Sequence, residues 1–111
     1  MSADYGWVHD VFSAFGPVSV RRMFGGAGLY RDGLMFALVS DNEIYLKADS
    51  ETVERFRAAG CRPFVYSRDG KSASMSYWSV PDGALDDPDA LKEWAALALE
   101  SAARSGKGKK R

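Results

Sequence analysis

The feature that most constrains the fold is the stretch from Ser19 to Ala48, in which apolar and polar residues alternate between turn signals. Alternation with a period of two is typical of β-strands, because successive side chains point to opposite faces of a sheet. The Asp32-Gly33 pair favours the positive φ angles of a tight hairpin turn, and Asp41-Asn42 marks a second turn. The stretch therefore predicts a run of antiparallel strands.

A second hairpin is predicted after residue 60. The segments 63–67 and 72–78 flank another Asp-Gly pair, Asp69-Gly70, which again suits a tight turn. In the second segment Ala73, Met75 and Tyr77 alternate with serines. We expect these three residues to face the core.

Three helices are predicted around the strands, over residues 3–15, 50–59 and 88–105. The first carries apolar residues three and four positions apart and stops at Gly16-Pro17. Asp49 or Ser50 caps the second, which ends at Gly60. The third begins at Pro88, behind the cap residue Asp87.

The predicted order α-β-β-β-α-β-β-α indicates an α+β fold with two layers, in which three helices cover one face of a mainly antiparallel, five-stranded sheet. A length of 111 residues fits one domain. We expect this domain to span residues 1–105, followed by a basic, disordered tail over residues 106–111. The expected core residues are Phe12, Phe36, Leu46, Phe56, Met75, Leu91 and Trp94.

Charge is unevenly distributed along the chain. The segment from Arg104 onwards holds five basic residues and no acidic one, so the rest of the chain carries a net charge of −5. An acidic body repels the phosphate backbone. We therefore expect nucleic acid to bind weakly and only through the tail.

The sequence favours a cytoplasmic location. Its single cysteine, Cys61, excludes an internal disulfide, and no Cys/His cluster suggests a metal site. The first ten residues lack the pattern of a signal peptide, and the apolar stretches are too short to span a membrane. We expect no bound cofactor and no membrane contact.

No motif in the sequence points to catalysis. The glycine-rich run from Met23 to Gly28 lacks the spacing of phosphate-binding loops and leads into a strand, which favours a glycine bulge or a tight strand connection. The serines of the second hairpin have only His9 as a possible base. Cys61 has Arg57 and Arg62 near it in sequence, which could lower its pKa, although a lone cysteine is more often a buried apolar residue.

Two patterns suggest a surface for contacts with proteins. Arg21 and Arg22 enter the sheet, while Tyr45 and Lys47 lie on its predicted polar face; Arg and Tyr are enriched at protein interfaces. The segment 34–39 is apolar on both faces. If Leu34, Phe36 and Leu38 face the core, then Met35, Ala37 and Val39 either lie beneath the first helix or form the apolar centre of an interface.

The chain also resembles a known family. The segments RRMFGGAGLY (21–30), GLMFA (33–37), YLK (45–47), FVY (64–66) and MSYW (75–78), followed by Val80-Pro81 and Asp87-Pro88, resemble the N-terminal domain of the TfoX/Sxy family, bacterial regulators of natural competence genes. The resemblance implies an α+β fold, a bacterial cytoplasmic protein without catalytic residues, and a transcriptional co-regulator that works with the cyclic-AMP receptor protein. Competence regulators of this family carry a second, C-terminal helical domain, so we expect a stand-alone N-terminal domain here.

We therefore predict a non-enzymatic regulatory or protein-binding module. Its expected interaction residues are Arg21, Arg22, Met35, Val39, Tyr45 and Lys47, and the partner is either another protein or a second copy of the chain. The alternatives are a small enzyme or ligand-binding domain of unknown substrate, and weak nucleic-acid binding through the basic tail.

Overall fold

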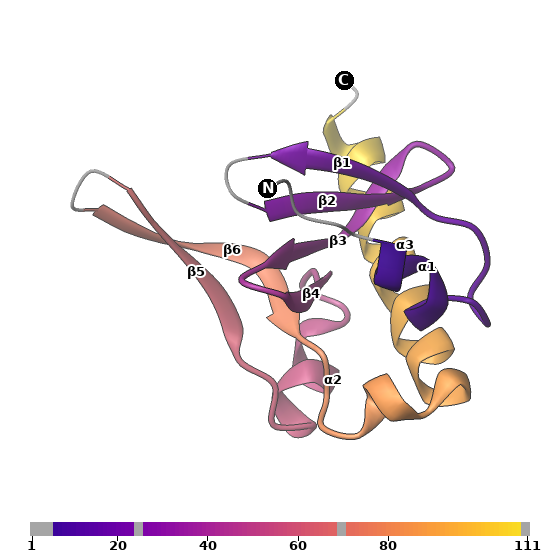
Figure 1. Cartoon of the computed structure of the whole chain (residues 1–111). Coiled ribbons are helices and arrows are strands. Elements are labelled where there is room, and N and C mark those ends of the chain that lie inside the picture. The colour runs from indigo at the N-terminus through magenta and orange to yellow at the C-terminus, as the bar shows by residue number, and fades with distance from the viewer. Residues whose placement is uncertain (1–5, 24–25, 69–70, 110–111) are drawn as a thin grey trace.

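One antiparallel sheet dominates the computed structural model, which describes residues 6–23, 26–68 and 71–109 (Figure 1). In chain order the elements are α1 (Gly6–Val11), β1 (Ser19–Met23), β2 (Gly26–Arg31), β3 (Leu34–Ser40), β4 (Glu43–Lys47), α2 (Val53–Ala58), β5 (Pro63–Arg68), β6 (Lys71–Ser79), the short 3-10 helix η1 (Ala84–Asp86) and α3 (Pro88–Lys109). The strand order across the sheet is β1-β2-β3-β4-β6-β5. The α+β class is confirmed.

The sheet has six strands in the described residues, so the prediction of five was wrong. The additional strand arises because the segment 19–31 forms two strands, β1 and β2, whereas the predicted order has three strands in all between the first and second helices. Met23 pairs with Gly26, which leaves only residues 24–25 between the two strands. This arrangement agrees with the tight strand connection predicted for the glycine-rich run.

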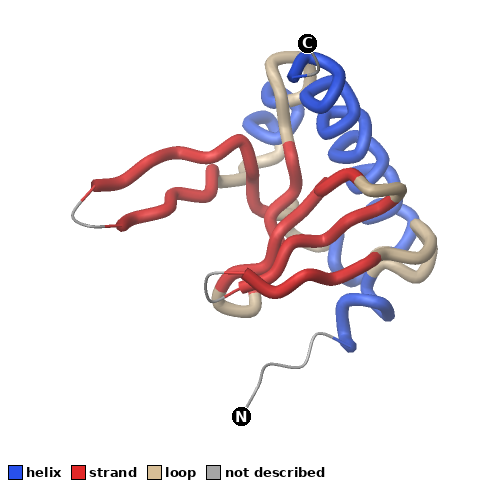
Figure 2. The backbone as a smooth tube through the Cα atoms, turned by 90° about the horizontal axis from the view of Figure 1, so that it is seen from above, coloured by secondary structure: helices blue, strands red, loops and turns tan. Residues whose placement is uncertain are grey.

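All three α-helices lie on the same side of the sheet (Figure 2). Each helix contributes buried residues to a single apolar cluster, and α3 packs across β3 and β4. The β5–β6 hairpin extends beyond the other strands, away from the helices (Figure 1). The molecule therefore has the two layers that the sequence predicts, and the described helices leave the opposite face of the sheet uncovered.

The hairpin turns form where the sequence predicts them. Asp32 and Gly33 adopt φ angles of 53° and 79°, and Asp41 and Asn42 adopt 51° and 63°. Two consecutive positive φ angles define the turn that matches the twist of paired strands. The third predicted turn, Asp69-Gly70, lies outside the described residues.

The helix α1 ends earlier than predicted. It ends at Val11, and the chain then turns, with the Gly16 N–H donating to the Phe12 carbonyl oxygen at 3.0 Å. Gly16 has a φ of 123°, which a helix cannot contain. This turn brings the ring of Phe15 to 5.1 Å from that of Phe36, so packing against the sheet ends the helix early.

The boundaries of α2 and α3 also differ in part from the prediction. α2 begins at Val53 rather than Ser50, because the Asp49 carboxylate accepts hydrogen bonds from the Glu51 and Thr52 N–H groups and holds that segment in a turn. The Asp87 carboxylate accepts from the Ala90 N–H at 3.2 Å, which confirms the predicted cap of α3.

The end of α3 was predicted at Ser105, and this was wrong because the helix continues to Lys109. Gly106 and Gly108 each cost a helix about 1 kcal/mol relative to alanine, which weakens a helix without forcing it to end. The expected division into a domain and a tail remains a prediction.

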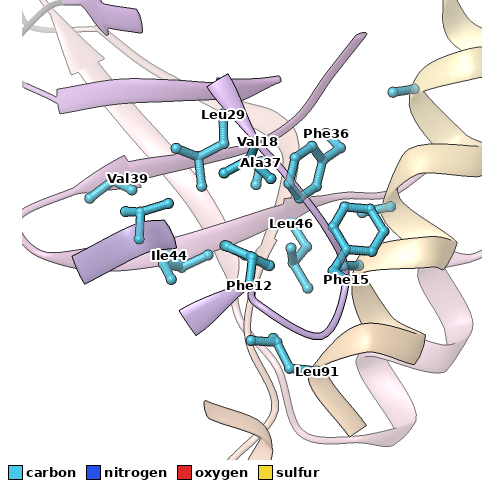
Figure 3. Close-up of a cluster of buried hydrophobic side chains, with 14 of the residues drawn as sticks. Phe12, Phe15, Val18, Leu29, Phe36, Ala37, Val39, Ile44, Leu46 and Leu91 are labelled. Atoms are coloured by element: carbon cyan, nitrogen blue, oxygen red, sulfur yellow. The ribbon is translucent and has the colours of Figure 1, made fainter. Parts of the chain in front are cut away.

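The apolar cluster between the helices and the sheet forms the core (Figure 3). Five of the residues predicted for it are almost fully buried: Phe12, Phe36, Leu46, Phe56 and Leu91. Trp94 is half-buried, and its ring lies 4.9 Å from that of Phe56. The side chain of Met75 lies outside the described residues.

A β-bulge in β3 decides which of its side chains reach this core. Leu29 pairs with Ala37 and Tyr30 pairs with Met35, so Phe36 is an extra residue in the ladder. A bulge of this kind places two consecutive side chains on the same face. Phe36 and Ala37 therefore both face the helices, and the predicted strict alternation from Leu34 to Val39 was wrong.

The start of α2 is joined to the last part of α3 by polar contacts. The Arg104 guanidinium donates to both carboxylate oxygens of Asp49, at 2.6 and 3.1 Å. Beside this pair the hydroxyls of Thr52 and Ser101, both buried, lie 2.9 Å apart. The hydrogen bond from Arg104 lowers the pKa of Asp49 from its ordinary value of 3.8 to about 2.

The variant Asp49→Asn is expected to lower the free energy of unfolding at pH 7 by about 1–2 kcal/mol, a value reduced for the partial exposure of the pair. Because folding lowers the pKa of Asp49, its carboxylate stabilises the folded state at any pH above its pKa in the unfolded chain. This stabilisation is lost as the pH falls through its pKa in the folded protein. The difference between the variant and the wild type should therefore narrow from pH 4 towards pH 2. Urea unfolding at pH 7 and pH 2.5 measures it.

Glu54→Gln is the matched control, because Glu54 pairs with Arg57 at an exposed position. We expect this control to change the free energy of unfolding by less than about 0.5 kcal/mol. An equal loss in both variants, or a difference that does not depend on pH, would show that the Asp49–Arg104 pair is not the cause.

Candidate functional site

The face of the sheet that the helices leave uncovered, called here the outer face, is the candidate site. Cross-strand partners share a face of a sheet, and one row of partners consists of Arg21, Gly28, Leu38, Tyr45 and Ser79. The adjacent row consists of Arg22, Ala27, Val39 and Ile44, of which Val39 and Ile44 belong to the core cluster. The first row therefore lies on the outer face.

Cations lie over aromatic rings on the outer face. The Arg21 guanidinium is 5.3 Å from the centre of the Tyr30 ring, and the Lys47 ammonium is 5.2 Å from the centre of the Tyr77 ring. Contacts of this length are attractive, because the face of an aromatic ring carries partial negative charge. Two positive charges are thus held in place above apolar surface.

The outer face is more deeply packed than an ordinary solvent-facing sheet. Leu38 and Tyr77 are each only 7% exposed, and Tyr30, Met35 and Lys47 are half-buried. Burial and, to a smaller extent, the nearby Tyr30 together raise the pKa of Tyr77 to about 12.

At the β5 side of the outer face, polar contacts border an aromatic pair. The rings of Tyr45 and Phe64 have centres 4.8 Å apart. The Tyr45 hydroxyl donates to Glu43 Oε1 at 2.9 Å, and Glu43 Oε2 lies 3.6 Å from the Arg62 guanidinium. Burial and the hydrogen bond to Glu43 both raise the pKa of Tyr45. Both tyrosines therefore remain protonated donors near neutral pH.

The structure brings four of the six predicted interaction residues together on the outer face: Arg21, Met35, Tyr45 and Lys47. Arg22 is exposed but projects from the other face of β1, and Val39 is 2% exposed in the core. The open choice for Ala37 and Val39 is therefore decided in favour of the core, beneath the helices. That these residues bind a partner remains a prediction.

Sequence reasoning missed Tyr30, Leu38 and Tyr77 as members of this face. Tyr77 was predicted to face the core, but Lys47 pairs with Tyr77 and Leu46 with Trp78, so Trp78 faces the core instead. The prediction recognised the alternation within β6 but left the large Trp78 out of it. Because Tyr77 and Trp78 are consecutive in β6, their side chains must point to opposite faces, and this signal in the sequence predicts an aromatic residue on each face.

A hollow of about 560 Å³ opens near one end of the sheet, beside Trp7. Its charged lining residues are Glu43, Asp82, Asp86 and Arg62, and no histidine or cysteine lines it. Glu43 is already engaged with Arg62. A nucleophile paired with a base, which most hydrolytic sites require, is absent from this lining.

Other chemistry is equally unsupported among the described residues. Burial raises the pKa of the Cys61 thiol, which is the opposite of the activation that a nucleophilic cysteine needs. The described residues contain no group of three side chains suited to hold a metal ion. In this part of the chain no helix is both long enough and apolar enough to cross a membrane.

Comparison with known proteins identifies relatives over most of this chain. The family model described as "TfoX N-terminal domain" matches residues 10–102. The DNA transformation protein TfoX1 of Aliivibrio fischeri is 31% identical over 86 residues, which cover 78% of this chain and 41% of that protein. Protein Sxy of Escherichia coli is 25% identical over 93 residues, which cover 84% of this chain and 44% of that protein. The matched part of the chain thus spans less than half the length of these curated relatives.

Proposed function

Because this chain belongs to the TfoX N-terminal domain family, we propose that it is a non-enzymatic regulatory module that binds another protein through its outer face. The observation that carries this proposal is a sheet face that the described helices leave uncovered, with a packed apolar centre, Leu38 and Tyr77, beneath two positioned cations, Arg21 and Lys47. Interfaces between proteins combine such an apolar aromatic centre with arginine and a polar rim.

A protein suits this face better than a single-stranded nucleic acid does. Nucleic-acid platforms on sheets need exposed ring faces on which bases stack. Here Arg21 and Lys47 lie over the rings of Tyr30 and Tyr77, and Tyr45 packs against Phe64. The net charge of −5 outside the basic C-terminal segment also opposes binding to phosphates.

The partner we propose is a transcription factor, the cyclic-AMP receptor protein, in the bacterial cytoplasm. The family resemblance noted in the sequence supports this choice, and the name DNA transformation protein given to a relative fits a role connected with competence. The hollow near Trp7 and the raised pKa of Cys61 support a role without catalysis.

The test is the affinity of the chain for this receptor protein, measured by titration calorimetry. Tyr45→Ala/Lys47→Ala removes an aromatic residue and a cation from the outer face. We expect binding to weaken at least about 30-fold, because truncating residues at the centre of an interface costs about 2 kcal/mol or more. Because Tyr45 packs against Phe64 and Lys47 lies over Tyr77, this variant should also lose about 1–2 kcal/mol of stability, so binding is measured well below its melting temperature.

Arg55→Ala/Lys92→Ala is the control, since both residues are exposed on the helices that lie on the other side of the sheet. This control should bind like the wild type. Unchanged binding by the outer-face variant would overturn the surface, and no binding by the wild type would overturn the partner. A second copy of this chain as the partner would appear as a doubled mass in sedimentation.

A further inference from the structure

The strand β1 forms one edge of the sheet, and no described strand covers its outer side. Within the described residues β1 pairs with β2 alone, in a register without a bulge. The opposite edge strand, β5, begins with Pro63 and has a register shift between Pro63 and Val65. Proline and bulges are devices that prevent further strands from adding to an edge. β1 has neither of them.

An open edge presents backbone N–H and C=O groups that another extended segment can pair with. Peptides bind to many domains by adding a strand in this way, with backbone hydrogen bonds supplying affinity and side chains supplying specificity. Arg21 and Arg22 are the charged residues of β1, and they are both exposed and project from opposite faces of the strand, so they can supply specificity for charge.

The two arginines select against a second copy of this chain. In an antiparallel pair of two β1 strands centred on this dipeptide, Arg21 faces Arg21 or Arg22 of the other copy. Like charges directly opposite each other in a sheet are destabilising. A strand with acidic residues at two successive positions instead places one carboxylate beside each guanidinium, on both faces of the sheet.

We propose that β1 accepts an acidic, extended segment of the partner protein as an added strand, paired through Arg21 and Arg22. This inference rests on the proposed function, because it assigns the partner segment that lies next to the outer face. Arg21 also lies over Tyr30, so an added strand extends the outer face at its β1 end.

The test uses the peptide TVEEVT and the isotopically labelled full chain. At about 1 mM peptide, amide shifts should be confined to β1 and its neighbour β2, and outward-facing amides of β1 should gain protection from hydrogen exchange. The matched peptide TVKKVT should bind about 2- to 30-fold more weakly, because each of the two cross-strand charge pairs contributes between about 1.4-fold and about fivefold.

The charge-reversed chain Arg21→Glu/Arg22→Glu should prefer TVKKVT over TVEEVT. Its amide signals outside β1 and β2 should match those of the wild type, which shows that the variant is folded. Absent shifts, shifts outside β1 and β2, or an unreversed preference would each overturn the strand addition. If TVEEVT fails while Tyr45→Ala/Lys47→Ala still abolishes partner binding, only this inference falls. If TVEEVT binds at β1 but that variant has no effect, the proposed outer-face function falls instead.

Discussion

Replacing Phe36 with alanine is expected to lower the free energy of unfolding by about 3–5 kcal/mol, a large part of the stability of a domain this size. Phe36 is fully buried, and the rings of Phe12 and Phe15 lie 5.4 and 5.1 Å from it (Figure 3). Ala37, the residue after Phe36, pairs with both β2 and β4, which limits how far the backbone can collapse into the cavity. Urea unfolding followed by tryptophan fluorescence measures the loss.

Leu85→Ala is the control for this substitution. Leu85 is 50% exposed, so its removal should change the free energy of unfolding by less than about 0.5 kcal/mol. A loss below about 1 kcal/mol in Phe36→Ala would mean that the helices close over the cavity. The described packing of Phe12 and Phe15 against Phe36 would then be wrong.

The variant Gly26→Ala is expected to destabilise the fold by at least about 3 kcal/mol. A Cβ atom at Gly26 would lie 2.1 Å from the carbonyl oxygen of Val39, a backbone atom in the middle of the sheet. Because neither strand can move without breaking its ladder, alanine must separate β2 from β3. Thermal unfolding should show a large fall in the melting temperature, together with loss of the β2 and β3 amide signals.

Gly33→Ala separates this steric effect from ordinary glycine strain. Gly33 has a φ of 79°, and a Cβ atom added there would meet no other atom within 4 Å. Alanine at this position therefore lowers the free energy of unfolding only through its left-handed backbone conformation, by about 1–2 kcal/mol. Gly26→Ala should be clearly the more damaging variant. Equal effects would show that close approach between β2 and β3 does not limit position 26.

The bulge that buries Phe36 also determines the composition of the outer face. It moves Ala37 and Val39 to the helix side and leaves Met35 and Leu38 on the other side. Without the extra residue, the residues on one side of the bulge in β3 would exchange faces, so that part of the helix side and part of the outer face would swap side chains. Stability and the proposed binding surface thus depend on the same local irregularity.

The local features of this protein follow from the sequence alone. Asp32-Gly33 and Asp41-Asn42 form turns because their preference for positive φ depends on the residues themselves. Asp87 caps α3 because its carboxylate reaches an N–H group three residues away. Large apolar residues such as Phe56 and Leu46 are buried in any arrangement that forms a core.

The faces of the strands were decided only by the tertiary structure. Whether Tyr77 or Trp78 faces the helices depends on the register in which β6 pairs with β4, a strand about thirty residues earlier in the chain. The separation of Arg21 from Arg22, and the burial of Val39, depend likewise on partners in other strands. A shift of one residue in pairing exchanges every side chain between the faces, and no local preference detects such a shift. The sequence therefore predicted which kinds of residue form the outer face. Which particular residues lie on it was decided by the register of the folded sheet.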